Sequence, residues 1–404
     1  RGKLSDEFLT HHAAADIRDA YRRLADLRQS RDELYERIST VMVMQEMPTP
    51  RPTFVLRRGE YDKPGDAVTP GVPPSLGKLT GDAPTNRLGL ARWLVAPEQP
   101  LTSRVAVNRL WQMLFGVGLV KTAEDFGSQG TPPSHPELLD WLAREFQDRD
   151  AWSLKQLTRE IVSSHTYRQS SRVTASETKG EMQMADPENR WLGRGPRFRL
   201  PAEAIRDQAL AASGLLVRRV GGPSVKPYQP ADLWKELATD TVYDQSHGGD
   251  LYRRTLYTYW KRTVAPPTLV TFDAAGREAC VVRESRTNTP LQALALLNDV
   301  TFVEAARQFA QRVLVEADAP DDRSRVAYAF RIATSRRPSD VELRVLVNGL
   351  EAHRARYRED AAGAAALVSA GESPRDERID VRELAAWTAL ASVLLNLDET
   401  VTKE

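Results

Sequence analysis

The sequence predicts a mainly α-helical fold, an irregular multi-helix domain with long loops and at most minor β structure. Three segments have the pattern of an N-terminal capping box, in which Ser or Thr precedes Glu or Gln by three positions: Ser134–Glu137, Thr289–Gln292 and Ser339–Glu342. Apolar residues recur three and four positions apart along most of the chain, as on one face of a helix. Alternation with a period of two, which indicates a half-buried strand, is scarce.

The first 46 residues are predicted to be a helical segment, with one long helix from residue 14 to about residue 45. Its apolar residues alternate at spacings of three and four, broken once by Arg31, and charged residues fill the other faces. A helix of this kind packs in a hairpin or on another domain. We therefore expect residues 1–46 to be the tail of a domain that lies upstream. The stripe consists of Ile17, Ala20, Leu24, Leu27, Leu34, Ile38 and Val41.

Residues 47–86 are predicted to be an extended linker. This segment is rich in Pro and Gly, and Pro both lacks an N–H donor and restricts the residue before it. One short strand is expected at residues 53–56, where Thr-Phe-Val-Leu combines β-branched and aromatic residues.

A helical domain is predicted from residue 87 to residue 404. One helix should end at Gly116, and helices should follow Ser134, Ser153 and Pro201. A single long helix should run from Pro290 past residue 309. Further helices should begin after residues 339 and 380, and the polar residues 169–185 should form the main internal loop.

Composition excludes several classes of protein. The 404 residues carry a formal net charge of +1, so no global field directs the chain to nucleic acid, and no groove-reading motif is present. The longest apolar runs fall far short of the ~20 residues of a membrane span. The only cysteine is Cys280, which excludes an internal disulfide and a CxxCH haem attachment and which we expect to be a buried thiol.

A series of ordered motifs carries a family resemblance. The first are Asn108–Gly116, Asp125–Gly127 and Pro133–Leu142, and the later ones are Arg199–Asp207, Tyr257, Lys261-Arg262, Phe272-Asp273 and Arg286–Leu294. Together they resemble the PSD-one domain, a domain of unknown function found in planctomycete and verrucomicrobial surface or periplasmic proteins. The resemblance covers about residues 87–397.

The resemblance implies a context and no reaction. Members of the family usually carry an upstream c-type cytochrome domain and a second domain of unknown function, neither of which is in this sequence. It therefore implies a periplasmic or cell-surface location, a cytochrome domain of the same protein as partner, and haem c in that upstream domain only. No cofactor or metal is expected in this chain itself.

Catalytic candidates are few. Asp125 lies in a Gly-flanked loop and His135 follows ten residues later, so the two could act as an acid/base pair, or both could simply stabilise turns. Asp273, in the Phe272-Asp273 motif, is a third candidate and could instead pair with nearby cations. Glu203 and Asp207 share a helix face, a spacing that is also typical of a solvated surface.

The strongest binding signal is the segment 252–262, in which four aromatic residues interleave with four cations. Aromatic rings stack on sugars, and Arg and Lys pair with sulfate, phosphate or carboxylate. Arg194, Arg197 and Arg199 form a second basic cluster. We hypothesise that these motifs converge on a cation-rich pocket for an anionic glycan. In the alternative, the aromatic residues belong to the core and the cations pair with acidic residues inside the protein. The predicted ligand-binding residues are Asn108, Arg109, Arg206, Tyr257, Lys261, Arg262, Arg286 and Asn288.

Three functions remain open at this point. The first is an accessory, ligand-binding domain of an extracytoplasmic protein linked to a c-type cytochrome, with an anionic polysaccharide as ligand. The second is a carbohydrate-active enzyme domain that uses the loop of Asp125 and His135. The third is a structural assembly module that uses its long N-terminal helix as a contact.

Overall fold

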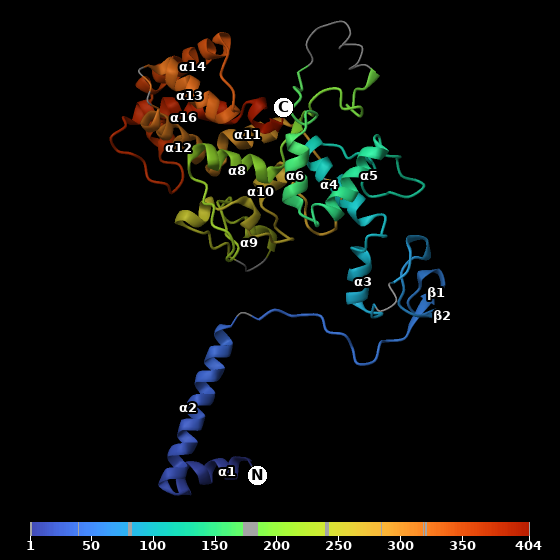
Figure 1. Ribbon diagram of the computed structural model, residues 1–404. Helices are drawn as coiled ribbons and strands as arrows, with labels where there is room; N and C mark the ends of the chain where they lie inside the picture. The colour runs from blue at the N-terminus through green and yellow to red at the C-terminus, as the bar shows by residue number, and fades with distance from the viewer. Residues whose placement is uncertain are drawn as a thin grey trace. The chain divides into compact units, whose positions relative to one another are not determined.

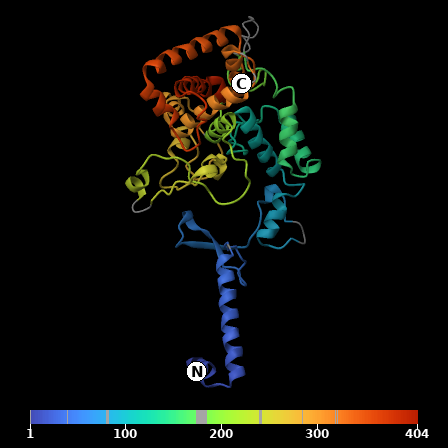
Figure 2. The same cartoon turned by 90° about the vertical axis from the view of Figure 1, so that its left-hand side faces the viewer.

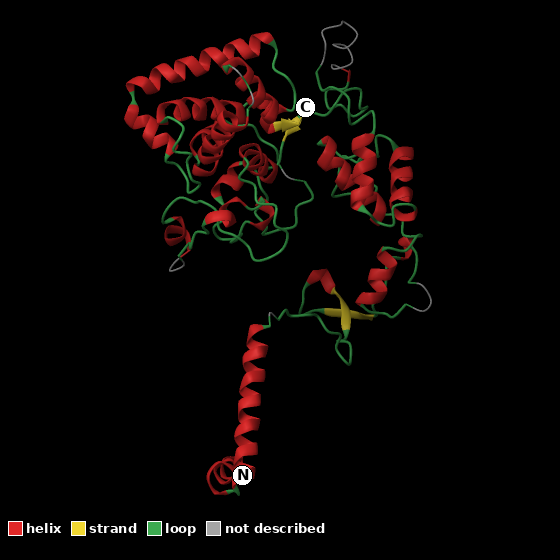
Figure 3. Cartoon of the chain, turned by 60° about the vertical axis from the view of Figure 1, so that its left-hand side comes forward, coloured by secondary structure: helices red, strands yellow, loops and turns green. Residues whose placement is uncertain are grey.

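The computed structural model describes residues 2–38, 40–79, 83–172, 185–238, 242–283, 285–317, 319 and 321–403. The chain divides into two compact units, residues 1–99 and 100–404, which we describe separately. The predicted mainly α fold is confirmed, because helices dominate and the described strands form only two small two-stranded sheets (Figure 3). The predicted boundaries after residues 46 and 86 both fall within the first unit.

The first unit begins with α1 (Gly2–Glu7), a π-helical turn (Phe8–His12) and α2 (Ala15–Arg37). Figure 2 shows α2 as one straight helix. The predicted long helix is therefore present but ends at Arg37 instead of near residue 45, and residues 40–47 have no regular structure. The β-branched residues Ile38, Val41 and Val43 lie just beyond this end, and such residues lose side-chain freedom in a helix.

A small hairpin and a short helix complete the first unit. The predicted strand is confirmed as β1 (Thr53–Leu56), which pairs antiparallel with β2 (Pro64–Val68). The helix α3 (Arg87–Leu94) begins after Asn86, whose side chain accepts hydrogen bonds from the N–H groups of Leu88 and Gly89. This is ordinary N-capping by Asn.

The second unit starts with three helices that share one apolar core. These are α4 (Thr102–Phe115), α5 (Pro136–Asp148) and α6 (Leu154–Ser163). As predicted, α4 ends at Gly116, and Ser153 caps α6 by accepting a hydrogen bond from Gln156 N. The buried apolar residues of this core include Val107, Trp111, Leu139, Leu142, Phe146, Leu157 and Ile161.

The capping box predicted at Ser134 is wrong. The N-cap of α5 is His135, which makes no capping hydrogen bond through its side chain. The backbone N–H of Ser134 donates to the carbonyl of Leu119 at 2.9 Å, and this holds Ser134 in the preceding loop. The hydroxyl of Ser134 lies 3.0 Å from His135 Nδ1. A long-range backbone contact has therefore overridden a local signal.

A second, larger helical core follows (Figure 1). Its centre is α12 (Val300–Glu316), which packs on α8 (Ala202–Ser213) and α16 (Val381–Leu395), and α16 in turn packs on α14 (Asp340–Glu359) and α15 (Ala361–Val368). Most of its buried residues are Ala, Leu and Phe, so the helices approach closely. Further α-helices in the described part of this unit are α9 (Leu233–Ala238), α10 (Pro267–Thr271), α11 (Pro290–Asn298), α13 (Asp322–Thr334) and α17 (Asp398–Val401).

The capping boxes at Thr289 and Ser339 are confirmed, each with both of its reciprocal hydrogen bonds. The predicted single helix after Pro290 is wrong, because it breaks into α11 and α12 at Asp299. Asp299 has an extended conformation, with φ −65° and ψ 134°, and its carboxylate accepts a hydrogen bond from Thr301 N. It therefore caps a new helix instead of continuing the old one.

The strand β3 (Phe198–Arg199) pairs antiparallel with β4 (Thr402–Lys403) and so fixes the segment that precedes α8. Cys280 is exposed, so its predicted burial is wrong; it lies in residues 276–280, a stretch of exposed residues without a regular helix or strand. Most of the predicted internal loop, residues 173–184, lies outside the described residues. Within the described ranges, no helix has the length and apolarity needed to cross a bilayer.

Candidate functional site

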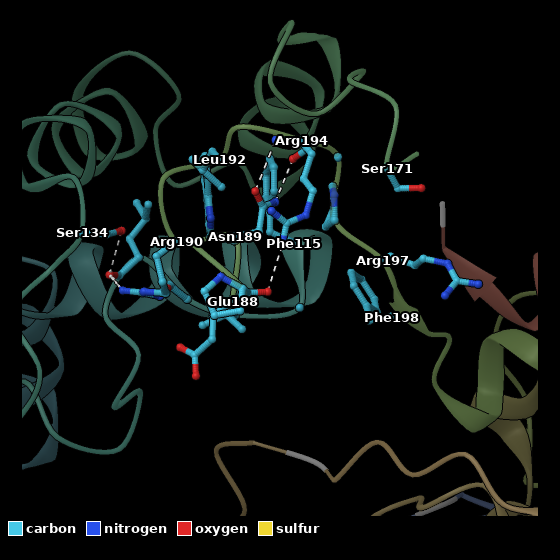
Figure 4. Close-up of a pocket in the computed structure, with 18 of the residues that line it drawn as sticks. Phe115, Ser134, Ser171, Glu188, Asn189, Arg190, Leu192, Arg194, Arg197 and Phe198 are labelled. Atoms are coloured by element: carbon cyan, nitrogen blue, oxygen red, sulfur yellow. Dashed lines mark hydrogen bonds between the residues drawn. The ribbon is translucent and has the colours of Figure 1, made fainter. Parts of the chain in front are cut away.

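A cavity of about 360 Å³ lies in the second unit, where α4 ends. The end of α4 and residues 116–119 form one wall, residues 187–198 form another, and Arg286 reaches in from a third segment. This volume falls within the usual range for a small-molecule site. The lining side chains include Trp111 and Arg286. Figure 4 labels others among them: Phe115, Ser134, Glu188, Arg190, Arg194, Arg197 and Phe198.

Aromatic rings form the apolar part of the wall. Trp111 and Phe115 lie four positions apart on α4 and therefore on one face, where their rings stack with centroids 4.1 Å apart and planes 9° apart. Gly116 ends the helix with φ 84°, and a Cβ added there would lie 2.8 Å from the ring of Phe198. The absence of a side chain at Gly116 thus allows Phe198 to complete the aromatic wall.

The guanidinium group of Arg190 is held by uncharged partners. It donates hydrogen bonds to the carbonyls of Gly118 at 2.8 Å and Leu119 at 3.1 Å. The backbone N–H groups of Arg190 and Trp191 donate to the buried carboxylate of Asp186. Carbonyl groups orient the guanidinium without neutralising its charge.

Arg194 is held in the same way. Its guanidinium donates to the carbonyls of Asp186 at 3.1 Å and Pro187 at 2.9 Å. The Asn189 side chain also exchanges two hydrogen bonds with the backbone of Arg194. Within the described ranges, neither Arg190 nor Arg194 has a carboxylate within ion-pair distance. The cavity wall therefore carries two fixed guanidinium groups that no described carboxylate pairs with.

Glu188 is the only acidic side chain among the described residues that line the cavity, and it already has a partner. Both of its carboxylate oxygens lie 2.7 Å from Lys121 Nζ. The hydrogen bond from Lys121 holds the pKa of Glu188 below its ordinary value, and the charge of Arg190 acts in the same direction. Glu188 is thus ionised and paired with Lys121, and within the described residues it forms no ion pair with Arg190 or Arg194.

Arg286 and Phe198 close one side of the cavity. The Arg286 guanidinium lies over the Phe198 ring, 4.1 Å from its centroid, which is a cation–π contact. Arg197 also lines the cavity and forms an ion pair with Asp398, so its charge is shared with a carboxylate.

The loop that carries Arg286 is clamped on both sides of Thr287. Arg199 Nε donates to the Thr287 carbonyl at 2.6 Å, and the Thr287 N–H donates to Asp273 at 2.7 Å. Burial acts to raise the pKa of Asp273, but the hydrogen bonds from Thr287 and the charge of Arg199 outweigh it and keep the pKa below its ordinary value. The predicted catalytic candidate Asp273 is therefore an ionised anchor that positions the Arg286 loop.

Of the eight predicted ligand-binding residues, only Arg286 lines the cavity. Asn108 is fully buried, and its amide group forms two hydrogen bonds with the backbone of Val120. This pairing supports the cavity wall from behind. Arg109, Arg262 and Asn288 are exposed and lie outside the cavity.

The other predicted binding residues belong to the packing around residues 251–261. Arg206 is buried and donates to the carbonyls of Leu251 and Arg253, and its burial lowers its pKa. Tyr257 lies under Arg253, with the guanidinium carbon 3.8 Å from the ring centroid, and Lys261 lies over Trp234 at 4.5 Å. Arg206 is thus held by carbonyl groups, Tyr257 and Lys261 take part in cation–ring contacts, and none of the three lines the cavity.

In the described part of the chain, no hydrogen bond joins the loop candidates Asp125 and His135. Asp125 accepts a hydrogen bond from Gly127 N at 2.7 Å, whereas His135 bonds to Ser134. Of Glu203 and Asp207, the two acidic residues predicted to share a helix face, Asp207 accepts hydrogen bonds from the N–H and hydroxyl of Thr255. Over the described part of the chain, no group of three His, Cys, Asp or Glu side chains is placed to hold a metal ion.

Sequence reasoning named Arg194 and Arg197 as a basic cluster but missed Arg190. The available signal was the density of arginines in residues 190–199, together with the Asp-Pro sequence before them and the Gly-Pro sequence among them. The aromatic wall from α4 was predicted only as the apolar face of a helix.

Comparison with known proteins places the chain in a family. A family model described as PSD1, protein of unknown function (DUF1553), matches residues 86–350. No match was found among curated proteins or among solved structures. All the residues that line the cavity fall inside the matched region, which covers well over half of the chain. The chain therefore belongs to the PSD1 (DUF1553) family of proteins of unknown function.

Proposed function

We propose that this protein is a binding domain for an anionic ligand, an acidic or sulfated glycan, which it holds in the cavity at the end of α4. One observation carries the proposal: Arg190 and Arg194 line a cavity with an aromatic wall, and carbonyl groups fix both guanidinium groups without neutralising them.

The geometry suits an anion because the cationic groups are already oriented. A guanidinium has five N–H donors. Arg190 and Arg194 each use two nitrogen atoms for carbonyl contacts and keep further N–H groups for a ligand. A carboxylate or sulfate group accepts such donors in pairs, and charge-assisted hydrogen bonds of this kind are about twice as strong as neutral ones. Little side-chain entropy is then lost on binding.

The aromatic wall favours a sugar over a simple inorganic anion. Trp111 and Phe115 line the cavity but are only 5% and 7% exposed, and their rings stack on each other. The half-buried ring of Phe198 is therefore the main apolar surface on which the C–H face of a sugar ring can pack. The family resemblance supports the setting that we propose for this activity. In that setting the chain is an extracytoplasmic accessory domain, and electron transfer belongs to a c-type cytochrome domain of the same protein.

Binding of a sulfated tetrasaccharide, compared with a neutral tetrasaccharide of equal length, tests the proposal by calorimetry. We expect binding of the sulfated probe only, and a loss of about tenfold or more in Arg194→Ala and in Arg286→Ala, since each removes a charged donor. Arg262→Ala is the matched control because Arg262 is exposed and outside the cavity.

Three results would contradict the proposal. Equal affinity for both probes would remove the role of charge. An equal loss of affinity in Arg262→Ala and Arg194→Ala would move the site to the 252–262 segment. Turnover of the probe by the wild-type chain, lost in Asp125→Ala, would identify an enzyme instead.

A further inference from the structure

The helix α2 carries an apolar stripe that none of the described residues covers. The stripe follows spacings of three and four, and α2 has no buried residue. Leu27 and Leu34 are 63% and 60% exposed. An exposed apolar stripe with this period is the pattern of a helix that packs against another helix. Its largest members on α2 are Ile17, Leu24, Leu27 and Leu34.

Cations border this stripe. With Leu24 and Leu27 taken as heptad positions a and d, Arg23 and Arg37 fall on one flank and Arg28 on the other. None of these three arginines forms an ion pair within the described residues, whereas Arg31, inside the stripe, pairs with Asp32. The three flanking charges therefore have no carboxylate partner in the part of this unit that the structure describes.

The acidic residues of α2 lie mainly on the other side. Asp26, Glu33 and Glu36 project from the face opposite the stripe, as their positions on a 3.6-residue period require. Only Asp16, in the first turn, places a carboxylate on a flank. The helix thus presents an apolar stripe with a cationic border toward any partner.

A second copy of the chain fits this surface poorly. In a parallel pair, Arg23 would face Arg28 of the other copy, and the Arg31 side chains would meet in the seam. In an antiparallel pair, Arg23 would face Arg37, and Arg28 would face its own equivalent. Like charges therefore oppose each other in both orientations, and this disfavours a homodimer.

We propose that the α2 stripe docks an amphipathic helix of another polypeptide, in which Asp or Glu flanks the apolar positions. Apolar side chains of that partner would fill the seam between Leu24 and Leu34. Its carboxylates would pair with Arg23, Arg28 and Arg37 on the two flanks of the stripe. Charged residues at the flanking positions of a coiled coil determine the choice of partner in this way. This surface is independent of the anion-binding cavity, which lies in the other unit.

The test uses the full chain and two synthetic peptides about four heptads long, both with Ile at a and Leu at d. One peptide has Glu at e and g, and the other has Lys. By fluorescence anisotropy, we expect the acidic peptide to bind at least about tenfold more tightly. Leu27→Glu should abolish that binding, and Glu33→Gln, on the opposite face, should leave it unchanged. Both positions are exposed, so circular dichroism should show the fold intact.

Each alternative outcome decides against the proposal. Equal affinity for the two peptides would exclude charge selection. Binding that survives Leu27→Glu and also Leu24→Glu would exclude the stripe. Self-association of the chain in sedimentation, lost in Leu27→Glu, would make a second copy the occupant.

Discussion

Arg199 and Asp273 form an ion pair, with Arg199 Nη2 2.6 Å from Asp273 Oδ2, and only 7% and 19% of the two side chains are exposed. Both partners also bind the backbone of Thr287, one at its carbonyl and the other at its N–H. The pair therefore links β3, the end of α10 and the loop before α11. Because Arg286 precedes Thr287, this structural contact places a cation at the cavity.

Removal of the Asp273 carboxylate should reduce both stability and ligand affinity. Asp273→Ala leaves the largely buried Arg199 without its charge partner, for which we expect a loss of about 3 kcal/mol in the free energy of unfolding. The N–H of Thr287 also loses its acceptor, so Arg286 should become less ordered. Urea unfolding measures the stability, and titration with the sulfated tetrasaccharide measures the affinity.

The exposed pair of Arg323 and Asp340 supplies the control for this change. The Asp340 side chain is 88% exposed, so Asp340→Ala should cost less than about 1 kcal/mol. An equal cost for Asp273→Ala and Asp340→Ala would show that the Arg199 pair is not a structural anchor.

Local hydrogen bonding explains which elements the sequence could predict. Both hydrogen bonds of the capping boxes at Thr289 and Ser339 form within four residues, so these boxes do not depend on the rest of the fold. The Ser134 prediction failed because its backbone bonds to Leu119, fifteen positions earlier in the chain. The break at Asp299 was missed because a lone Asp inside an apolar pattern does not reveal its cap.

The cavity was harder to predict than the helices, because its residues meet only in the tertiary fold. Sequence reasoning found a basic cluster at Arg194 and Arg197 but could not know that Arg190 and Arg194 have carbonyl partners instead of carboxylates. The interleaved aromatics and cations of residues 252–262 gave the stronger pattern. Most of that pattern is used in internal stacking, as between Arg253 and Tyr257. A charge pattern alone does not show which cations remain uncompensated.

A side chain at Gly116 should damage the aromatic wall. In Gly116→Ala, the new Cβ would lie 2.8 Å from the ring of Phe198, and φ 84° is unfavourable for alanine. We expect a loss of about 1–3 kcal/mol in the free energy of unfolding, together with weaker binding of the sulfated tetrasaccharide.

Gly349 is the matched position for that substitution. It lies within α14, where an added Cβ would meet nothing within 4 Å. Gly349→Ala should therefore raise stability by about 0.5–1 kcal/mol and leave binding unchanged. If both variants had the same stability and affinity as the wild type, the position of the Phe198 ring would not depend on the absence of a side chain at Gly116.

The pair of Arg336 and Glu342 should make stability depend on pH in the acidic range. The hydrogen bond from Arg336 lowers the pKa of Glu342 to about 2, against the opposing effect of burial. A carboxyl group whose pKa is lower in the folded state stabilises above its unfolded pKa, and this contribution falls as pH drops toward 2. Glu342→Gln should thus cost about 1 kcal/mol near neutral pH, since the pair is partly exposed, and almost nothing near pH 2.

Urea unfolding of wild type and Glu342→Gln at about pH 7, pH 5 and pH 3 measures this difference. Gln at this position can still accept the hydrogen bond from Ser339 N, so the capping box is kept while the charge and one hydrogen bond from Arg336 are lost. A difference in stability that stays constant over this range would contradict the assignment to ionised Glu342.

The buried pair of Glu304 and Arg307 should show strong coupling. Both side chains are 1% exposed and lie 3.6 Å apart, and Glu304 Oε1 accepts hydrogen bonds from the Tyr252 hydroxyl at 2.9 Å and from Ser373 N at 2.6 Å. Tyr252→Phe removes one hydrogen bond and should cost about 1–2 kcal/mol. Glu304→Gln leaves the charge of Arg307 unbalanced and should cost more, about 3–5 kcal/mol.

A double-mutant cycle separates charge pairing from packing at this site. In Glu304→Gln with Arg307→Met, no buried charge remains, so the double variant should lose less stability than the sum of the two single changes. Arg307 also donates to the carbonyl and hydroxyl of Ser373, so part of its loss should persist. Additive losses in urea unfolding would mean that the two charges act independently, and that the segment around Ser373 is fixed by its hydrogen bonds alone.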